Sequence, residues 1–300
     1  MNKTLNFSSK FKAANTFSLL IFLSSILFIL FKGLNYGIDF KGGTLIELRT
    51  NNIDASAIRS TLAKMDLGDV NVKKFGKDGD YLIKVEQKES TDNTIIPLIK
   101  KELTNNLNTE INFRRVENVG PKVSSELLQS GIIAISLSLA AMLFYIWIRF
   151  EWQFSVGSII ALFHDVVITL GIFSILSLEI NLSIIAAVLT IVGYSMNDTV
   201  VIYDRIRENL SKYNRLNITE IADLSINDTL ARTIITSVTT LLALLSIFIL
   251  GGEILRGFSF AMILGVLIGT YSSIFVAAPI LKFFKVTYKT LEKKDEKIVP

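Results

Sequence analysis

The sequence predicts an α-helical membrane bundle of six transmembrane helices, with an α+β domain inserted between the first and the second helix. Half of the 300 residues are hydrophobic and only 19% are charged, whereas soluble domains carry about 25% charged residues. Six apolar runs are long enough to cross a bilayer. A polar stretch over residues 33–126 separates the first run from the other five.

The first apolar run follows a basic N-terminal segment. Residues 13–31 carry no charge and are long enough to span the membrane. A secretory signal peptide is the alternative, but the run is longer than a usual signal core, and residues 32–36 offer no small-x-small cleavage site. The sequence therefore favours an uncleaved anchor, with a cytoplasmic N-terminus over residues 1–12 and a transmembrane helix over 13–32.

Residues 33–126 are predicted to form a water-soluble domain. The segment opens with the glycine-rich stretch Gly37–Thr44. Its element order, β-α-β-β-α-β, is that of a ferredoxin-like domain, a scaffold that by itself indicates no function. The expected elements are a strand at 44–50, a helix from the cap Asp54 to Met65, strands at 70–75 and 81–86 joined by a turn at 77–80, a helix at 92–107 and a strand at 110–119.

The remaining apolar runs predict a five-helix bundle over residues 127–281. Two of the runs are interrupted, one by His164 and Asp165 and the other by Asp198. A charged loop is expected over 204–232 and a tail over 282–300. The five expected helices are 127–148, 152–178, 180–203, 233–252 and 257–281.

Basic residues in the short loops predict the orientation. They lie in the N-terminal segment, at Arg149, in the loop 204–232 and in the tail, whereas the loops on the opposite side carry only Arg256. Both termini are therefore expected to be cytoplasmic. The domain at 33–126 would then be periplasmic, and it is too long to obey the charge rule itself.

Asp198 is a costly residue in this arrangement. A charge at the middle of a bilayer costs about 2.5–3.5 kcal/mol, and Arg232 is expected at a depth comparable to that of Asp198. One interpretation is structural: the carboxylate bonds to Ser195, Tyr194 or Thr199 and pairs with Arg232 as a topology clamp. The other is a proton-coupling site in which Asp198 titrates as it separates from Arg232 and meets it again.

His164 and Asp165 are two further ionisable residues in an apolar run. A lone histidine in an apolar helix is more often a packing residue than a relay. Asp165 lies on a stripe with Gly157, Ala161 and Thr169, so it should face other helices rather than lipid. Either a proton relay or a structural hydrogen bond fits this pair.

Small residues recur at four-residue spacing along the last expected helix. Such a stripe lets helix backbones approach closely. It predicts a helix interface, either within the bundle or with another chain. Its members are Gly257, Ala261, Gly265, Gly269, Ser273 and Ala277.

The stretch 204–217 is charged and helical in pattern, which is typical of a solvated loop helix or of a docking surface for a cytoplasmic partner. Farther along, residues 225–229 repeat the pattern of residues 195–199. Because its surroundings are polar, Asp228 in this second copy is interpreted as the N-cap of the fifth helix.

Several site types are excluded by the composition. The chain has no cysteine and one histidine, so thiolate and His-rich metal sites are excluded. No Gly-Lys-[Ser/Thr] phosphate loop and no nucleophile–His–acid arrangement is evident. The sequence therefore predicts neither a cofactor or metal nor an enzyme, and no nucleic-acid binding.

Six stretches together resemble the SecD/SecF family, whose members are bacterial inner-membrane subunits of the Sec export machinery. The resemblance runs from about residue 10 to residue 285, and the region around Asp198 also resembles the wider resistance-nodulation-division transporters. The stretches are Gly37–Thr44, Gly120–Ser124, His164-Asp165, Gly193–Asn209, Arg232–Ser237 and Gly269–Ile274.

The resemblance implies a partner and a role. A chain of this kind would pair with SecD in a twelve-helix bundle, associate with the SecYEG channel and YajC, meet SecA only indirectly, and aid the release of unfolded exported proteins. It implies that Asp198 and Arg232 take part in proton transport. A proton-driven transporter half for small molecules or lipids and a passive scaffold subunit are the alternatives.

Overall fold

The computed structural model describes residues 5–50, 53–65, 67, 70–74, 78–85, 95–107, 109–213 and 215–295. The chain forms two compact units. The helical unit contains the chain up to Asn35, Ile135–Leu178 and the chain from Ser183 onward. The sheet unit contains Tyr36–Ala134 and the short segment Glu179–Leu182.

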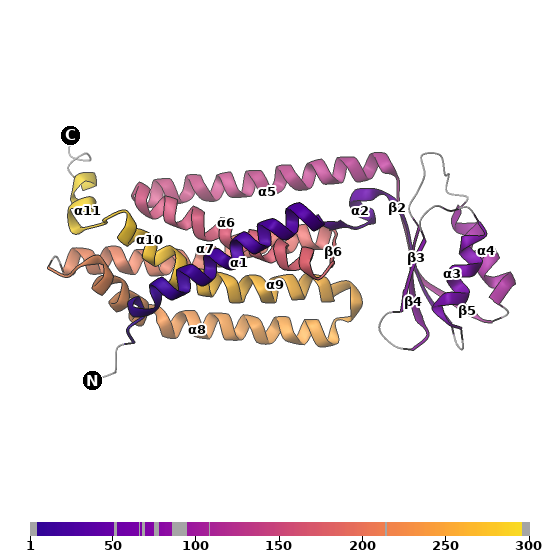
Figure 1. The fold of residues 1–300 in the computed structure, drawn as a ribbon. Helices are drawn as coiled ribbons and strands as arrows, with labels where there is room; N and C mark the ends of the chain where they lie inside the picture. Colours follow the sequence, from indigo (N-terminus) through magenta and orange to yellow (C-terminus); the bar gives the residue numbers. More distant parts are fainter. Residues whose placement is uncertain are drawn as a thin grey trace. The chain divides into compact units, whose positions relative to one another are not determined.

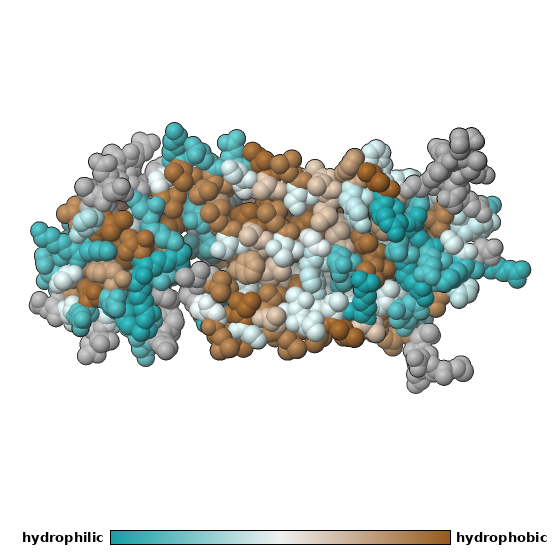
Figure 2. Space-filling view, turned by 180° about the vertical axis from the view of Figure 1, so that it is seen from behind, coloured by the Kyte–Doolittle hydropathy of each residue, from teal (hydrophilic) through white to brown (hydrophobic). Residues whose placement is uncertain are grey.

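The helical unit is built from long helices, and six helices among the described residues are long and apolar enough to cross a membrane. Figure 1 shows them running alongside one another. Figure 2 shows hydrophobic side chains over the middle of this unit and hydrophilic ones at the end that carries the α7–α8 connection. The elements that lie wholly or in part in this unit are η1 (Ser8–Lys10), α1 (Phe11–Lys32), α5 (Pro121–Arg149), α6 (Trp152–Ile175), α7 (Leu182–Lys212), α8 (Ile218–Leu250), α9 (Gly252–Ser272), the π-helical turn η2 (Ser273–Ala277), α10 (Ala278–Phe283) and α11 (Tyr288–Asp295).

Most of the stretch 204–232, expected to connect two membrane helices, is helical. Helix α7 continues to Lys212, and α8 begins at Ile218. The start of α8 is fixed by a capping box: the Asn217 side chain accepts bonds from the backbone N–H groups of Thr219 and Glu220, and the Glu220 side chain reaches back to the Asn217 N–H. Such a box satisfies N–H groups that have no partner within the helix.

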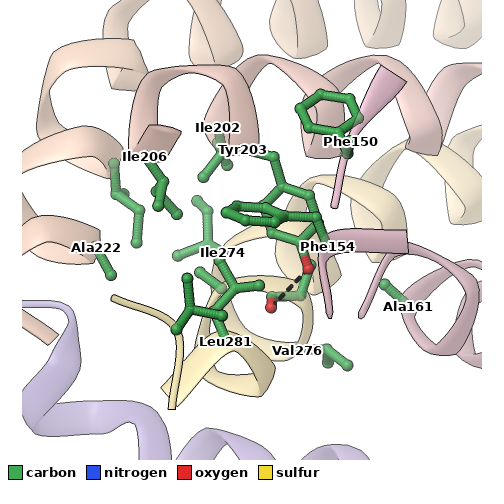
Figure 3. Packing of buried hydrophobic residues seen from close by; sticks show 14 of the residues in the cluster. Phe150, Phe154, Ala161, Ile202, Tyr203, Ile206, Ala222, Ile274, Val276 and Leu281 are labelled. Atoms are coloured by element: carbon green, nitrogen blue, oxygen red, sulfur yellow. Dashed lines mark hydrogen bonds between the residues drawn. The ribbon is translucent and has the colours of Figure 1, made fainter. Parts of the chain in front are cut away.

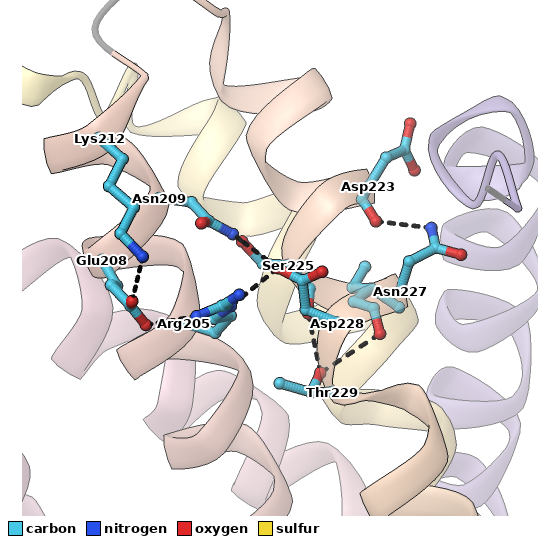
Figure 4. Close-up of polar contacts among 10 residues, drawn as sticks. Arg205, Glu208, Asn209, Lys212, Asp223, Ser225, Asn227, Asp228 and Thr229 are labelled. Atoms are coloured by element: carbon cyan, nitrogen blue, oxygen red, sulfur yellow. Dashed lines mark hydrogen bonds and ion pairs between the residues drawn. The ribbon is translucent and has the colours of Figure 1, made fainter. Parts of the chain in front are cut away.

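Asp228 lies inside α8, so its interpretation as an N-cap is wrong. Its carboxylate instead accepts bonds from Arg205 at 2.8 Å and Asn209 at 3.3 Å, both on α7. Glu208 pairs in turn with Arg205 at 2.6 Å and with Lys212. Figure 4 shows this polar network between the ends of α7 and α8. The charges predicted to lie in a loop thus join two helices.

The sheet unit contains the predicted order of strands and helices. Its four antiparallel strands lie in the order β3-β4-β2-β5, and Figure 1 shows α3 and α4 on one face of the sheet. Buried Ile46, Leu48 and Ile83 pack with Ile58 and Leu103 of these helices. Residues 75, 77, 86 and 92–94 of the expected elements lie outside the described residues. The elements are β2 (Gly43–Thr50), α3 (Ala55–Ala63), β3 (Val70–Lys74), β4 (Asp80–Val85), α4 (Ile95–Leu107) and β5 (Ile111–Val119).

Two short strands form a small second sheet. Strand β1 (Asn35–Tyr36) pairs with β6 (Glu179–Ile180), the segment between α6 and α7. The short helix α2 (Ile38–Lys41) follows β1 and ends at Gly42, whose φ of 81° favours glycine. Chain segments far apart in the sequence therefore meet at the start of α7.

The apolar core of the helical unit gathers around Tyr203 (Figure 3). The ring packs edge-on against Phe154, with centroids 5.1 Å apart. Its hydroxyl donates a hydrogen bond to the Ala277 carbonyl at 2.9 Å. Gly157 leaves room for this hydroxyl, because a Cβ there would collide with it. The tyrosine joins α7 to η2 in a fixed position.

The small-residue stripe of α9 packs on α7 of the same chain. A Cβ at Gly265 would collide with the Ile191 side chain, and one at Gly269 would lie 2.9 Å from Ser195 Cβ. Gly257 approaches Ile184 less closely, at 3.5 Å, and Ala261 is fully buried. The close approach of helices predicted from the stripe is therefore present within this bundle.

We expect Gly269→Ala to destabilise the protein by about 1–3 kcal/mol, the usual cost of overpacking. The added methyl would meet Ser195 Cα as well, at 3.2 Å, so backbone would have to move. Gly193→Ala on α7 is the matched control, since only Met142 Cε lies within reach, at 4.0 Å. Thermal unfolding in detergent should show a lower midpoint for Gly269→Ala than for Gly193→Ala, and equal midpoints would contradict the close contact.

Candidate functional site

Asp165 lies at the centre of a buried polar network in the helical unit. Its carboxylate has no exposed surface. Oδ2 accepts a bond from Ser195 of α7 at 2.5 Å and another from Ser272 of α9 at 2.7 Å. Oδ1 lies 2.9 Å from Nδ1 of His164, its neighbour on α6. Three helices thus meet at one carboxylate.

His164 packs beside this carboxylate and against α1. Its ring stacks on Phe22 with an interplanar angle of 9° and a centroid distance of 6.1 Å. The other ring nitrogen, Nε2, is buried and has no hydrogen-bond partner among the described residues. The histidine therefore keeps one nitrogen that can donate or accept a further hydrogen bond.

Asp198 lies one turn farther along α7 than Ser195 and is only 2% exposed. Thr270 of α9 donates to its Oδ2 at 3.4 Å, a long bond. The Thr270 hydroxyl is also 2.8 Å from the Ser237 hydroxyl of α8. A chain of hydroxyls therefore links Asp198 to α8.

The two acids share the elements that hold them. Ser195, which donates to Asp165, and Asp198 itself are both on α7. Ser272 and Thr270, which donate to Asp165 and Asp198 respectively, lie two residues apart on α9. Hydroxyl groups can both donate and accept hydrogen bonds. The hydroxyls beside the two acids can therefore donate to a carboxylate or accept from a neighbouring group.

Arg232 does not pair directly with Asp198. Its side chain is exposed on α8, near enough for its charge to act on the Asp198 carboxylate, but no ion pair joins the two within the described ranges. Two other expected partners of Asp198 have different surroundings. The Thr199 hydroxyl lies 2.8 Å from the Ser273 hydroxyl, and the Tyr194 hydroxyl has no partner among the described residues. Asp198 and Arg232 therefore interact through charge alone in the described part of the chain.

Sequence reasoning missed Ser272, Thr270 and Ser237 as partners of the acids. Thr270 and Ser272 of α9 lie within the stretch Gly269–Ile274, which carries part of the family resemblance but for which the sequence predicts no role. A signal was present, because Ser and Thr side chains in membrane helices hydrogen-bond across to neighbouring helices. Over the described residues, no cluster of three or more His, Asp or Glu side chains could hold a metal ion.

The comparisons with known proteins agree on one family. The family described as protein export membrane protein SecD/SecF, C-terminal, matches residues 99–287, and the SecD/SecF GG motif matches residues 27–52. Protein translocase subunit SecF of Rickettsia bellii is 49% identical over 276 residues, which is 91% of both chains. The chain belongs to the SecD/SecF family. The corresponding subunit of Rickettsia rickettsii is 47% identical, covering 94% of this chain and 93% of its own.

Solved structures extend the match to the fold. SecDF of Thermus thermophilus, a translocon-associated membrane protein, is 36% identical with a TM-score of 0.86 over 95% of this chain. SecDF in a super-membrane-facing form is 34% identical with a TM-score of 0.71. The chain spans only 39% of the first SecDF chain. It is thus a multi-pass membrane protein of the SecD/SecF family, and Asp165, Asp198 and Arg232 lie within the matched region.

Proposed function

We propose that this chain is an accessory subunit of Sec protein export that couples the proton motive force to late translocation and release of exported proteins. The observation that supports this most is the pair of carboxylates, Asp165 and Asp198, buried among hydroxyls within membrane-spanning helices. Ionisable residues inside a membrane are rare and mark ion or proton paths. We infer that the cargo is protein from the relatives named as protein translocase subunits.

Asp198 would be the proton-binding group, and Arg232 the charge that favours its ionised form. One proton crossing the full field is worth about 2.3 kcal/mol per 100 mV. That free energy biases a conformational change only if the two states differ in their affinity for the proton. Arg232 would provide this difference in proton affinity, because the Asp198 carboxylate can lie near the arginine in one state and away from it in the other. Asp165 and His164 would form a relay beside this site.

SecD would be the partner that completes the bundle. This chain covers 39% of the SecDF chain and 95% of its own length in that match, which is consistent with a second chain supplying the remainder. We also propose that the pair associates with SecYEG and YajC, indirectly with SecA, and with unfolded exported proteins. The protein would have no catalytic activity of its own. Its location would be the bacterial inner membrane, with both termini cytoplasmic.

The sheet unit would be a ferredoxin-like periplasmic domain. Its order of elements and its antiparallel sheet order β3-β4-β2-β5 support the fold. The periplasmic placement rests on the distribution of basic residues in the short loops. Movement of this domain would act on the exported chain.

Arg232→Met tests the coupling, with Arg232→Lys as the matched control. In membrane vesicles that contain the partner, we expect Arg232→Met to assemble normally but to lose most of the stimulation of export by an imposed proton gradient. Arg232→Lys keeps a positive charge and should retain much of it. Disassembly of the Arg232→Met complex would favour a structural clamp, and unchanged stimulation would contradict the coupling role.

A further inference from the structure

The glycine-rich stretch Gly37–Gly43 contacts the beginning of α7. The Asp39 Oδ2 atom accepts a hydrogen bond from the backbone N–H of Leu182 at 2.9 Å. Leu182 is the first residue of α7, and the first N–H groups of a helix have no partner within it. A carboxylate at this position also interacts favourably with the helix dipole. Asp39 therefore stabilises the first turn of α7.

Backbone pairing holds the same segment to the connection before α7. The Gly37 N–H donates to the Ile180 carbonyl at 2.8 Å, next to the pairing of β1 with β6. Gly37 is buried against the Glu179 side chain, since a Cβ there would lie 2.5 Å from Oε1. The path of the chain before α7 is therefore fixed over several residues.

Strand β4 and the first turn of α5 also contact these segments. Lys84 of β4 forms an ion pair with Glu179 of β6. Burial, followed by the nearby Lys73, lowers the pKa of Lys84 to about 8, whereas the Asp39 charge acts in the opposite direction. Buried Ser124, in the first turn of α5, donates to the Ile38 carbonyl at 3.4 Å.

We infer that Asp39 is a positioning residue that fixes the first turn of α7 to the sheet unit, so that a displacement of α7 moves this unit. This rests on the proposed coupling function. Residues Glu179–Leu182 belong to the sheet unit, and α7 continues from Leu182 without a break to Lys212. Asp198 lies sixteen positions after Leu182, which corresponds to about 24 Å of helix.

Asp39→Ala should separate proton binding from export. In vesicles with the partner, we expect gradient-stimulated export to fall about fivefold, the effect of losing one charged helix-end contact, while proton uptake measured with a pH-sensitive dye stays unchanged. A residue with only a structural role would lower both together. Asp54→Ala is the matched control, because Asp54 caps α3 within the sheet unit through Ala55 N–H at 2.8 Å and does not touch α7 in the described contacts.

A disulfide between positions 37 and 179 tests whether the attachment stays closed during the cycle. A Cβ at Gly37 would lie 3.2 Å from Glu179 Cγ, the position that the sulfur of a cysteine at 179 would take, so the two side chains are close enough to bridge. The φ of Gly37 is −77°, which other residues can adopt. The chain contains no cysteine, so Gly37→Cys with Glu179→Cys would form a single pair. We expect the same gradient-stimulated export from the oxidised and the reduced forms. Export blocked by oxidation and restored by reduction would overturn the inference.

The two proposals fail in different ways. If Asp198→Asn loses gradient stimulation but Asp39→Ala keeps it, only the role of Asp39 is overturned. If Asp198→Asn keeps full stimulation, the coupling function itself fails, whatever Asp39→Ala does. Loss of both uptake and export in Asp39→Ala, with the Asp54→Ala control intact, would show a general structural role and would also overturn the inference.

Discussion

Asp198→Asn is expected to abolish the stimulation of protein export by a proton gradient while the subunit stays assembled with its partner. An amide has nearly the shape of a carboxyl group and can still accept the bond from Thr270, which is 3.4 Å away. It cannot take up a proton at any physiological pH. One proton at 100 mV provides about 2.3 kcal/mol, which is a bias of up to about fiftyfold between two states, and this bias would be lost.

Export into inverted membrane vesicles, with the gradient imposed or collapsed by a protonophore, measures this effect. Asp204→Asn is the matched control, since Asp204 is a half-exposed acid on the same helix that pairs with Arg149 at 2.7 Å. It should keep the stimulation. Full stimulation in Asp198→Asn would instead favour a passive scaffold, and loss of the assembled complex would show that the carboxylate is needed for folding.

Asp165→Leu is expected to have the largest effect on stability. The substitution leaves the Ser195 hydroxyl and the His164 ring nitrogen without their partner in a buried place, whereas Ser272 keeps its bond to the Gly269 carbonyl at 3.1 Å. Each orphaned buried polar group costs about 1–3 kcal/mol, so the loss should be at least about 2 kcal/mol. We expect little assembled protein, and a thermal unfolding midpoint in detergent far below that of the wild type.

Asp165→Asn separates this structural effect from a relay role. The amide oxygen can still accept bonds from the two serines, so the folded complex should form in useful amounts. If Asp165 relays protons, proton uptake should fall in this variant although the complex is intact. A Leu variant as stable as the wild type would contradict the network, and normal uptake in the Asn variant would leave Asp165 with the structural role alone.

Much of the fold could be predicted from the sequence, because apolar length and alternation are local properties. The apolar runs and the β-α-β-β-α-β order need no knowledge of tertiary contacts. Helices α7 and α8 extend beyond their apolar runs for a physical reason. Their charged ends pair with each other, as Arg205 does with Asp228, so residues that seemed too polar for a packed helix are satisfied by a neighbouring helix.

The candidate site could be predicted only in part. The cost of a buried charge is enough to single out Asp165 and Asp198, and the small residues near Asp165 indicate that it faces inward. The hydroxyls that contact Asp165 and Asp198 are determined by the packing of α9 against α7. That packing depends on how each helix is rotated about its own axis. The contact between Asp39 and Leu182 joins residues 143 positions apart, which no local pattern can reveal.

The π-helical turn Ser273–Ala277 between α9 and α10 has a geometric consequence. One extra residue in a turn rotates everything beyond it by about 100° relative to a continuous α-helix. Ser272 can therefore face a carboxylate on one side of the turn while Leu281 on the other side lies fully buried in the apolar core. The wide turn also leaves the Ala277 carbonyl available to Tyr203. The run from α9 through η2 to α10 thus contacts the polar network at Asp165 and, within three turns, the apolar core around Tyr203.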